Sequence, residues 1–212
     1  MHGIFFEPPL ESNFIGHQMS EIYKEGVYRP FLQDKRDMTI LDIGANIGIT
    51  SYYFSQHARQ VYSLEPSKDH FGIFTRMLEF NQIQNVKAIN KAIYIDSKPH
   101  TLHHNPNKTM YSLHGAVSDG TGEEVETMTL KELFEQEKIE HVDLMKLDIE
   151  GSEIEVLSHS DFVELAPKID LLITERHDWS GRNPNQLTEA LKNAGFKVDQ
   201  AQSSADLVIG YK

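Results

Sequence analysis

The chain has 212 residues, a formal net charge of −12 and no cysteine. This length suits a single domain with a full hydrophobic core, and the lack of cysteine excludes disulfides, thiolate metal sites and cysteine nucleophiles. The negative charge would repel phosphate backbones, so nucleic acid is not an expected partner. The sequence has neither a signal-peptide pattern nor an apolar run of about 18 residues, so we expect a soluble, cytoplasmic protein without a membrane partner.

Strand-like and helix-like apolar patterns alternate along most of the chain. We interpret residues 1–38 as an N-terminal cap segment and residues 39–212 as the core of one domain. Strands are expected at 40–43, 61–64, within 85–95, and at 142–147, 169–174, 196–200 and 206–211. Helices are expected at 47–57, 71–81, from 129, from 151, and at 183–195. This alternation predicts an α/β fold with a doubly wound, mainly parallel sheet that ends in an antiparallel hairpin. Residues 96–125 are irregular and could form a mobile cover over a site.

A glycine-containing turn, Gly44-Ala45-Asn46-Ile47-Gly48, follows the first predicted strand and precedes a helix. Glycines let the backbone approach a ligand, and the first N–H groups of a helix face it. Glu65 follows the second predicted strand, where an acid pairs with two ribose hydroxyls. Ile49 stands where a dinucleotide fingerprint needs its third glycine. The pattern therefore favours S-adenosylmethionine, with Asn46 and turn amides at its carboxylate and Asp42 or turn carbonyls at its ammonium.

Polar residues follow five of the predicted strands, and ligands bind beyond the carboxyl ends of such strands. These strand ends are Gly44-Ala45-Asn46, Glu65-Pro66, Asn90-Lys91-Ala92, Asp148-Ile149-Glu150 and Glu175-Arg176-His177. We expect them to converge on one crevice. The residues expected to bind the cofactor are Asp42, Gly44, Ala45, Asn46, Gly48, Glu65, Pro66, Asn90, Lys91, Ala92 and Asp148.

The candidate catalytic residues are His177, Asp148, Glu150 and Glu175. His177 titrates near neutral pH and shares a strand face with Glu175, so we expect it to take a proton or orient the acceptor. Asp148 and Glu150 share a face by the two-residue period and would hold hydroxyl groups. These four residues include metal-ligand types, but no tight spacing supports a metal, and none is expected. Glu153 and Glu155 are assigned to helix stabilisation, with Ser152 and Glu155 as a capping box.

The segments LDIGANIG, SLEP, TLKEL, DLMKLDIEGSE and ITERH, in this order, resemble the FkbM family of S-adenosylmethionine-dependent methyltransferases over residues 19–180. The resemblance implies a Rossmann-like class I fold, a seven-stranded sheet with one antiparallel strand, and methyl transfer to an oxygen of a metabolite or carbohydrate. It also implies that Gly44, Asn46, Gly48 and Glu65 bind the cofactor, and that Asp148 and Glu150 lie by the reacting methyl.

The nature of the acceptor and two other functions stay open at this point. The acidic crevice favours a neutral, polyhydroxylated or cationic acceptor over a phosphorylated one. One alternative is a non-catalytic module that binds a nucleoside or S-adenosylmethionine. The other is an NAD-dependent oxidoreductase, which Ile49 disfavours.

Overall fold

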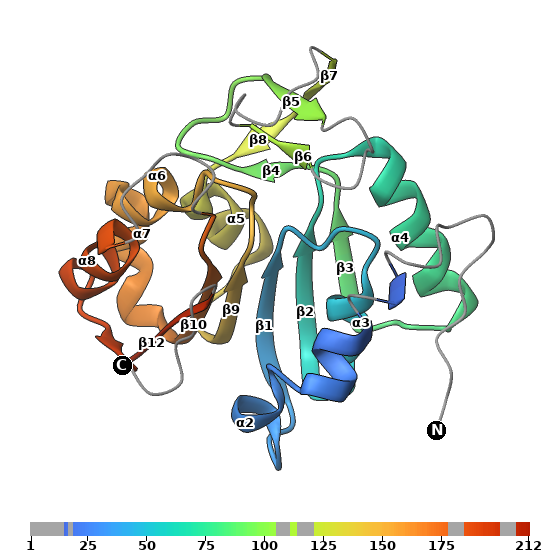
Figure 1. The fold of residues 1–212 in the computed structure, drawn as a ribbon, viewed down its shortest axis with the longest axis horizontal. Helices are drawn as coiled ribbons and strands as arrows, with labels where there is room; N and C mark the ends of the chain where they lie inside the picture. Colours follow the sequence, from blue (N-terminus) through green and yellow to red (C-terminus); the bar gives the residue numbers. More distant parts are fainter. Residues whose placement is uncertain (1–14, 17–18, 105–110, 114–120, 178–184, 200–206) are drawn as a thin grey trace.

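A seven-stranded sheet forms the centre of the computed structural model, which describes residues 15–16, 19–104, 111–113, 121–177, 185–199 and 207–212 (Figure 1). The strand order is β11-β12-β10-β9-β1-β2-β3. The strands are β1 (Met38–Ile43), β2 (Ala58–Leu64), β3 (Val86–Ile89), β9 (Val142–Leu147), β10 (Ile169–Glu175), β11 (Lys197–Val198) and β12 (Leu207–Tyr211). Strand β12 runs antiparallel to both of its neighbours, β10 and β11, and the other described pairs of this sheet are parallel. The predicted parallel sheet and closing hairpin are confirmed.

Helices cover both faces of the sheet, which explains why every residue of β1 is buried. Figure 1 shows α5 (Leu130–Glu137), α6 (Glu153–Ser158), α7 (Ser160–Leu165) and α8 (Asn185–Asn193) on one side. On the other side lie α3 (Ile49–Ser55) and α4 (Lys68–Phe80), with η1 (Ser20–Glu25) and α2 (Arg29–Leu32) nearby. A short 3₁₀ turn, η3 (Ala166–Lys168), leads into β10. Ile40 and Leu41 belong to different core clusters, because successive strand residues face opposite sides.

Side chains cap the helix at two of three helix starts. The Ser67 side chain accepts a hydrogen bond from the His70 N–H at the start of α4. At α5, Thr129 and Glu132 form a complete capping box. The Ser152 side chain makes no capping hydrogen bond at α6, so the capping box predicted from Ser152 and Glu155 is wrong.

Two small sheets lie beyond one end of the main sheet (Figure 1). Strand β4 (Ala92–Ile93) pairs with β8 (Thr127–Met128), so the strand predicted within 85–95 is split into β3 and β4. Strand β5 (His100–His104) pairs with β6 (Tyr111–Ser112) and β7 (Gly122–Val125). Residues 105–110 and 114–120 of the expected cover lie outside the described residues. Within the described part of the chain, we find no helix that is long and apolar enough to cross a bilayer.

Candidate functional site

Two adjoining cavities lie at the carboxyl ends of the central strands. The first encloses about 600 Å³, including space open to solvent, and the second about 370 Å³. They share Gly44, Asn46 and Asp148 as wall residues. Of the expected site residues, the first cavity adds Glu65, Pro66, Lys91, Ala92 and Glu150, and the second adds Ala45 and Glu175. The strand ends therefore meet as expected.

The glycine-containing turn is held by hydrogen bonds to the end of β2. The N–H groups of Gly44 and Ala45 donate to the Leu64 carbonyl oxygen at 3.0 and 2.9 Å. Gly44 has a φ of +85°, and a Cβ there would overlap the carbonyl oxygen of Asp148, so glycine lets the β1 and β9 loops touch. A Cβ at Gly48 would overlap the Phe74 ring of α4. Gly48 lines neither cavity, so the structure gives it a role in helix packing, and the cofactor contact stays a prediction.

Glu65 is 5% exposed and links the turn to the start of α4. Its carboxylate oxygens accept hydrogen bonds from the N–H groups of Asn46 and Ser67, each at 2.9 Å. Burial raises the pKa of Glu65 to about 7, although these two N–H groups oppose the shift. Each carboxylate oxygen has two lone pairs, so both can still accept from ribose hydroxyls. The pairing of Glu65 with a ribose stays a prediction.

Asn90 contacts the backbone of Glu65 and Pro66, which line the first cavity, but its own side chain does not line that cavity. Its side-chain amide donates to the carbonyl oxygens of Glu65 and Pro66 at 2.8 and 3.0 Å. It is absent from the walls of both cavities. Asn90 therefore fixes the Glu65-Pro66 backbone, and its direct contact with the cofactor stays a prediction.

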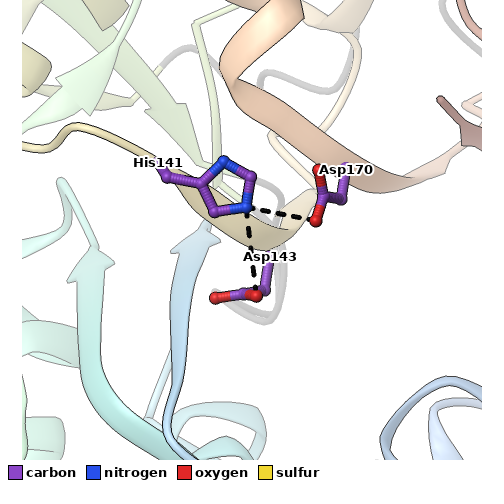
Figure 2. A group of neighbouring side chains, drawn as sticks. All are labelled: His141, Asp143 and Asp170. Carbon is purple, nitrogen blue, oxygen red and sulfur yellow. Dashed lines mark hydrogen bonds and ion pairs between the residues drawn. The ribbon is translucent and has the colours of Figure 1, made fainter.

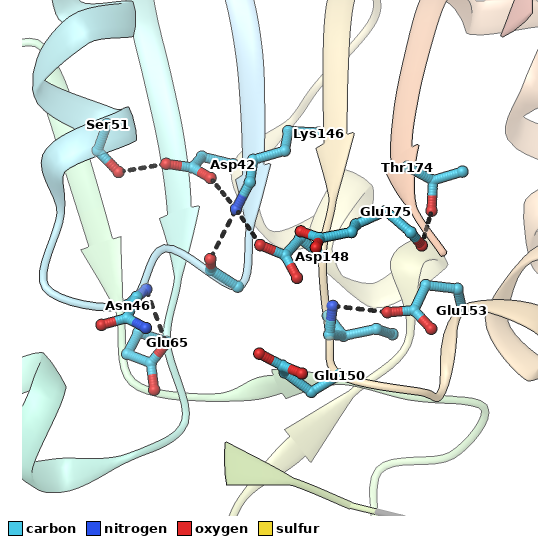
Figure 3. Close-up of polar contacts among 12 residues, drawn as sticks. Asp42, Asn46, Ser51, Glu65, Lys146, Asp148, Glu150, Glu153, Thr174 and Glu175 are labelled. Carbon is cyan, nitrogen blue, oxygen red and sulfur yellow. Dashed lines mark hydrogen bonds and ion pairs between the residues drawn. The ribbon is translucent and has the colours of Figure 1, made fainter. Parts of the chain in front are cut away.

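Lys146 of β9 is a buried cation that the sequence interpretation missed (Figure 3). Its Nζ donates to the Gly44 carbonyl oxygen at 2.8 Å and lies 3.2 Å from Asp148 Oδ2 and 3.4 Å from Asp42 Oδ1. Burial lowers the pKa of Lys146, but Asp148 and Asp42 outweigh it and hold this pKa well above the usual value. A lysine inside the apolar run 142–147 is the signal that could have revealed it.

Asp42 lies under the turn, with no exposed surface. One carboxylate oxygen accepts from Ser51 Oγ at 2.6 Å and the other faces Lys146 (Figure 3). Asp42 therefore has no exposed atom for the ammonium contact that was predicted as one option. Its observed role is to balance the charge of Lys146.

His177 lies among three carboxylates, with its side chain 6% exposed. Its Nε2 is 3.2 Å from Glu150 Oε2 and 3.7 Å from Asp148 Oδ1, and its Nδ1 is 3.0 Å from Glu153 Oε1. Burial lowers the pKa of His177, but Glu150 and Glu153 outweigh it and raise this pKa to about 11. These carboxylates favour the protonated ring. Both predicted roles of His177, to take a proton or to orient the acceptor, stay predictions.

Glu153 orders the loop after β9, in addition to opening α6. It is 3% exposed, and its carboxylate accepts from the N–H groups of Ile149 at 2.9 Å and Gly151 at 3.0 Å. Assigning Glu153 to helix stabilisation alone is therefore wrong. Glu150 lies in this loop with a φ of +56°, so Asp148 and Glu150 converge through a turn and not through a strand period.

Glu175 ends β10 and lines the second cavity together with Lys146 and Asp148. Burial and then the nearby Asp148 raise the pKa of Glu175 to about 8. Figure 3 shows its carboxylate near Asp148, at the end of the neighbouring strand. The predicted carboxylate group is thus assembled from β9, β10 and the loop between β9 and α6.

The residues around the first cavity suit the chemistry of S-adenosylmethionine. Glu65 offers a buried carboxylate for a ribose diol, and Pro66, Ala92 and Ile93 offer an apolar wall for an adenine ring. Asn46 and the Gly44 turn supply polar groups toward the second cavity. Leu102 of β5, Tyr111 of β6 and the adjoining Leu113 also line the first cavity.

Comparison with known proteins gives one family and one related enzyme. The model of the methyltransferase FkbM domain matches residues 42–198. The hexuronic acid methyltransferase AglP of Haloferax volcanii is 25% identical over 190 residues, which cover 88% of this chain and 76% of that protein.

Solved methyltransferase structures share the fold. Precorrin-6y C5,15-methyltransferase from Geobacter metallireducens has a TM-score of 0.52 at 11% identity, with 89% of each chain covered. A SAM-dependent methyltransferase from Aquifex aeolicus has a TM-score of 0.50 at 14% identity, with 96% of this chain and 98% of that chain covered. The family match establishes S-adenosylmethionine as the cofactor in place of NAD. This chain belongs to the FkbM family of methyltransferases.

Proposed function

We propose that the protein transfers the methyl group of S-adenosylmethionine to an oxygen of a hydroxylated carbohydrate, with hexuronic acids as the first class to test. The observation that carries the proposal is the position of Asp148, which lines both cavities beside the glycine-containing turn. Glu150 lies next to it on the wall of the first cavity. The similarity to AglP, whose acceptor is a hexuronic acid, supports a carbohydrate acceptor.

The protein must align the acceptor oxygen with the methyl group and accept a proton when that oxygen is a hydroxyl. The bound cofactor supplies an electrophilic methyl on a sulfonium. Asp148 and Glu150 accept hydrogen bonds from acceptor hydroxyls, and one of these carboxylates receives the proton. Lys146 fixes Asp148 and the Gly44 carbonyl relative to one another. If the methyl group goes to a carboxylate oxygen of the acceptor, no base is needed, because that oxygen carries no proton.

A transfer assay tests this proposal. The protein is incubated with methyl-labelled S-adenosylmethionine and a panel of hexuronic acids, neutral hexoses and amino sugars, and the products are identified by mass spectrometry. We expect label on a hexuronic acid. Asp148→Asn should lower turnover by about 10²–10⁴-fold, while binding of S-adenosylhomocysteine persists.

Asp170→Asn is the matched control, because Asp170 is an exposed carboxylate at the start of β10, away from the cavities. It should leave turnover unchanged. Tight cofactor binding without transfer to any panel member would overturn the proposal and favour the non-catalytic alternative.

A further inference from the structure

Two groups of described residues combine one histidine with two carboxylates whose ligand atoms all lie within 4.8 Å of one another. One is Asp148, Glu150 and His177, and the other is His141, Asp143 and Asp170. We propose that Asp148, Glu150 and His177 bind a divalent transition-metal cation of the Mn²⁺ type at the edge of the first cavity. The site follows from this geometry alone, whereas its role in holding the acceptor rests on the function proposed above.

The three side chains offer compatible atoms at compatible spacing. His177 Nε2 is 3.2 Å from Glu150 Oε2 and 3.7 Å from Asp148 Oδ1. Ligands that each lie about 2.1 Å from an ion are about 3 Å apart at a right angle, so small adjustments would place one ion between these atoms. The ion would take the place of the proton on Nε2, because a histidine nitrogen binds a metal only without its proton. One imidazole with two carboxylates suits Mn²⁺, Fe²⁺, Co²⁺ or Zn²⁺ better than Ca²⁺ or Mg²⁺.

The remaining nitrogen of His177 is oriented as in metal-binding histidines. Its Nδ1 lies 3.0 Å from Glu153 Oε1, and Glu153 is 3% exposed. A histidine that binds a metal usually donates its other ring N–H to a carboxylate, which fixes the ring and its tautomer. Glu153 is itself held by the N–H groups of Ile149 and Gly151. This support leaves Nε2 directed at Asp148 and Glu150, while Lys146 holds the far oxygen of Asp148.

The charge of the site gives an independent reason for a cation. Among the described residues, the carboxylates of Asp148, Glu150 and Glu153 lie around His177, Lys146 pairs with Asp148, and Glu175 lies near Asp148. Such a surface would repel a hexuronate, although the related AglP acts on a hexuronic acid. A divalent ion would offset this repulsion and bind the acceptor through its oxygens. An acceptor hydroxyl on the ion would also lose its proton more easily, and Glu175, which lies near Asp148 and is not a ligand, could receive it.

The second group serves as an internal comparison (Figure 2). His141 Nε2 lies 3.1 Å from Asp170 Oδ2 and 4.0 Å from Asp143 Oδ1, near the starts of β9 and β10. These side chains are 36–59% exposed, and Asp143 also accepts from the Thr39 N–H at 2.7 Å. Because β9 and β10 are parallel, this group lies at the amino ends of these strands, whereas the cavities lie at the carboxyl ends. It has the same ligand types without the cavity.

The experiment titrates chelator-treated full-length protein with MnCl₂ and follows free Mn²⁺ by electron paramagnetic resonance. We expect one site per chain. His177→Ala and the shape-conserving Glu150→Gln should each weaken binding at least tenfold, and Glu153→Gln about tenfold through the orientation of His177. His141→Ala should leave the affinity unchanged. Binding of S-adenosylhomocysteine, which these substitutions should preserve, shows that each variant is folded.

The outcomes separate this inference from the proposed function. No stoichiometric Mn²⁺ binding, or equal binding by the wild type and His177→Ala, would overturn the site. Loss of binding in His141→Ala alone would also overturn it. Methyl transfer to a hexuronic acid that is unaffected by chelation would reject the ion's role and leave the proposed function standing. Mn²⁺ binding that depends on His177, without any transfer to carbohydrate, would support the site and reject the proposed function.

Discussion

At the scale of single residues, Lys146 connects the two halves of the site. It contacts the glycine-containing turn through the Gly44 carbonyl, the buried Asp42 and the cavity-lining Asp148. Lys146→Met would leave Asp42 charged, buried and without its cation, which costs about 3–5 kcal/mol of unfolding free energy. Urea unfolding measures this change. The double variant Asp42→Asn/Lys146→Met should recover much of the loss, and no recovery would argue against the pairing.

Glu65 gives a prediction about pH. Because burial raises its pKa to about 7, this carboxyl gains its full charge only as the pH rises through that value. A charged carboxylate accepts hydrogen bonds from ribose hydroxyls more strongly than a neutral carboxyl does. We therefore expect the affinity for S-adenosylhomocysteine to rise by about tenfold between pH 6 and 8. Calorimetric titration of the wild type and Glu65→Gln checks this.

The wild type and Glu65→Gln are compared because the difference in the pH dependence of their affinity for S-adenosylhomocysteine comes from Glu65 and not from the other groups that titrate in the cavities. The same raised pKa has the opposite effect on stability, because the folded state holds the proton more tightly than the unfolded state between about pH 4.5 and 7. This contribution to stability is present at low pH and is lost as the pH rises through 7. An equal pH dependence of binding in Glu65→Gln would contradict the assignment.

At the scale of secondary-structure elements, helix caps provide a matched pair of substitutions. Thr129 completes a capping box at α5, whereas the Ser152 side chain makes no capping hydrogen bond at α6. Thr129→Ala should lower the unfolding free energy by about 1 kcal/mol, and Ser152→Ala should lower it by less. Thermal unfolding of both variants compares them. Equal losses would mean that the capping box at α5 contributes little.

Most elements of the main sheet could be predicted because their signals are local. The apolar runs 142–147 and 169–174 match β9 and β10 to within one residue. The path of the chain between 96 and 125 could not be predicted in detail, because its short strands depend on partners far along the sequence. β5, for example, pairs with β7, about twenty residues later. Pro30 lies in the first turn of α2, where proline is tolerated.

At the scale of the whole molecule, strand order decides which residues meet. The sequence identified the strand ends as the place of the site, since parallel strands share one carboxyl edge. It missed Lys146 and Glu153, because their partners are set by tertiary contacts. Asp42 and Lys146 are paired across neighbouring strands although 104 positions separate them. The charge of His177 likewise depends on Glu150 and Glu153, so its ordinary pKa was a poor guide to its role.

The central claim is that S-adenosylmethionine lies between the Gly44 turn, Glu65 and Asp148. A crystal structure with S-adenosylhomocysteine, the demethylated product, tests this most directly. We predict that both ribose hydroxyls will lie within hydrogen-bond distance of the Glu65 carboxylate. The adenine should lie against Pro66 and Ala92, and the sulfur should face Asp148. A ligand bound elsewhere, or a ribose that does not contact Glu65, would contradict the account.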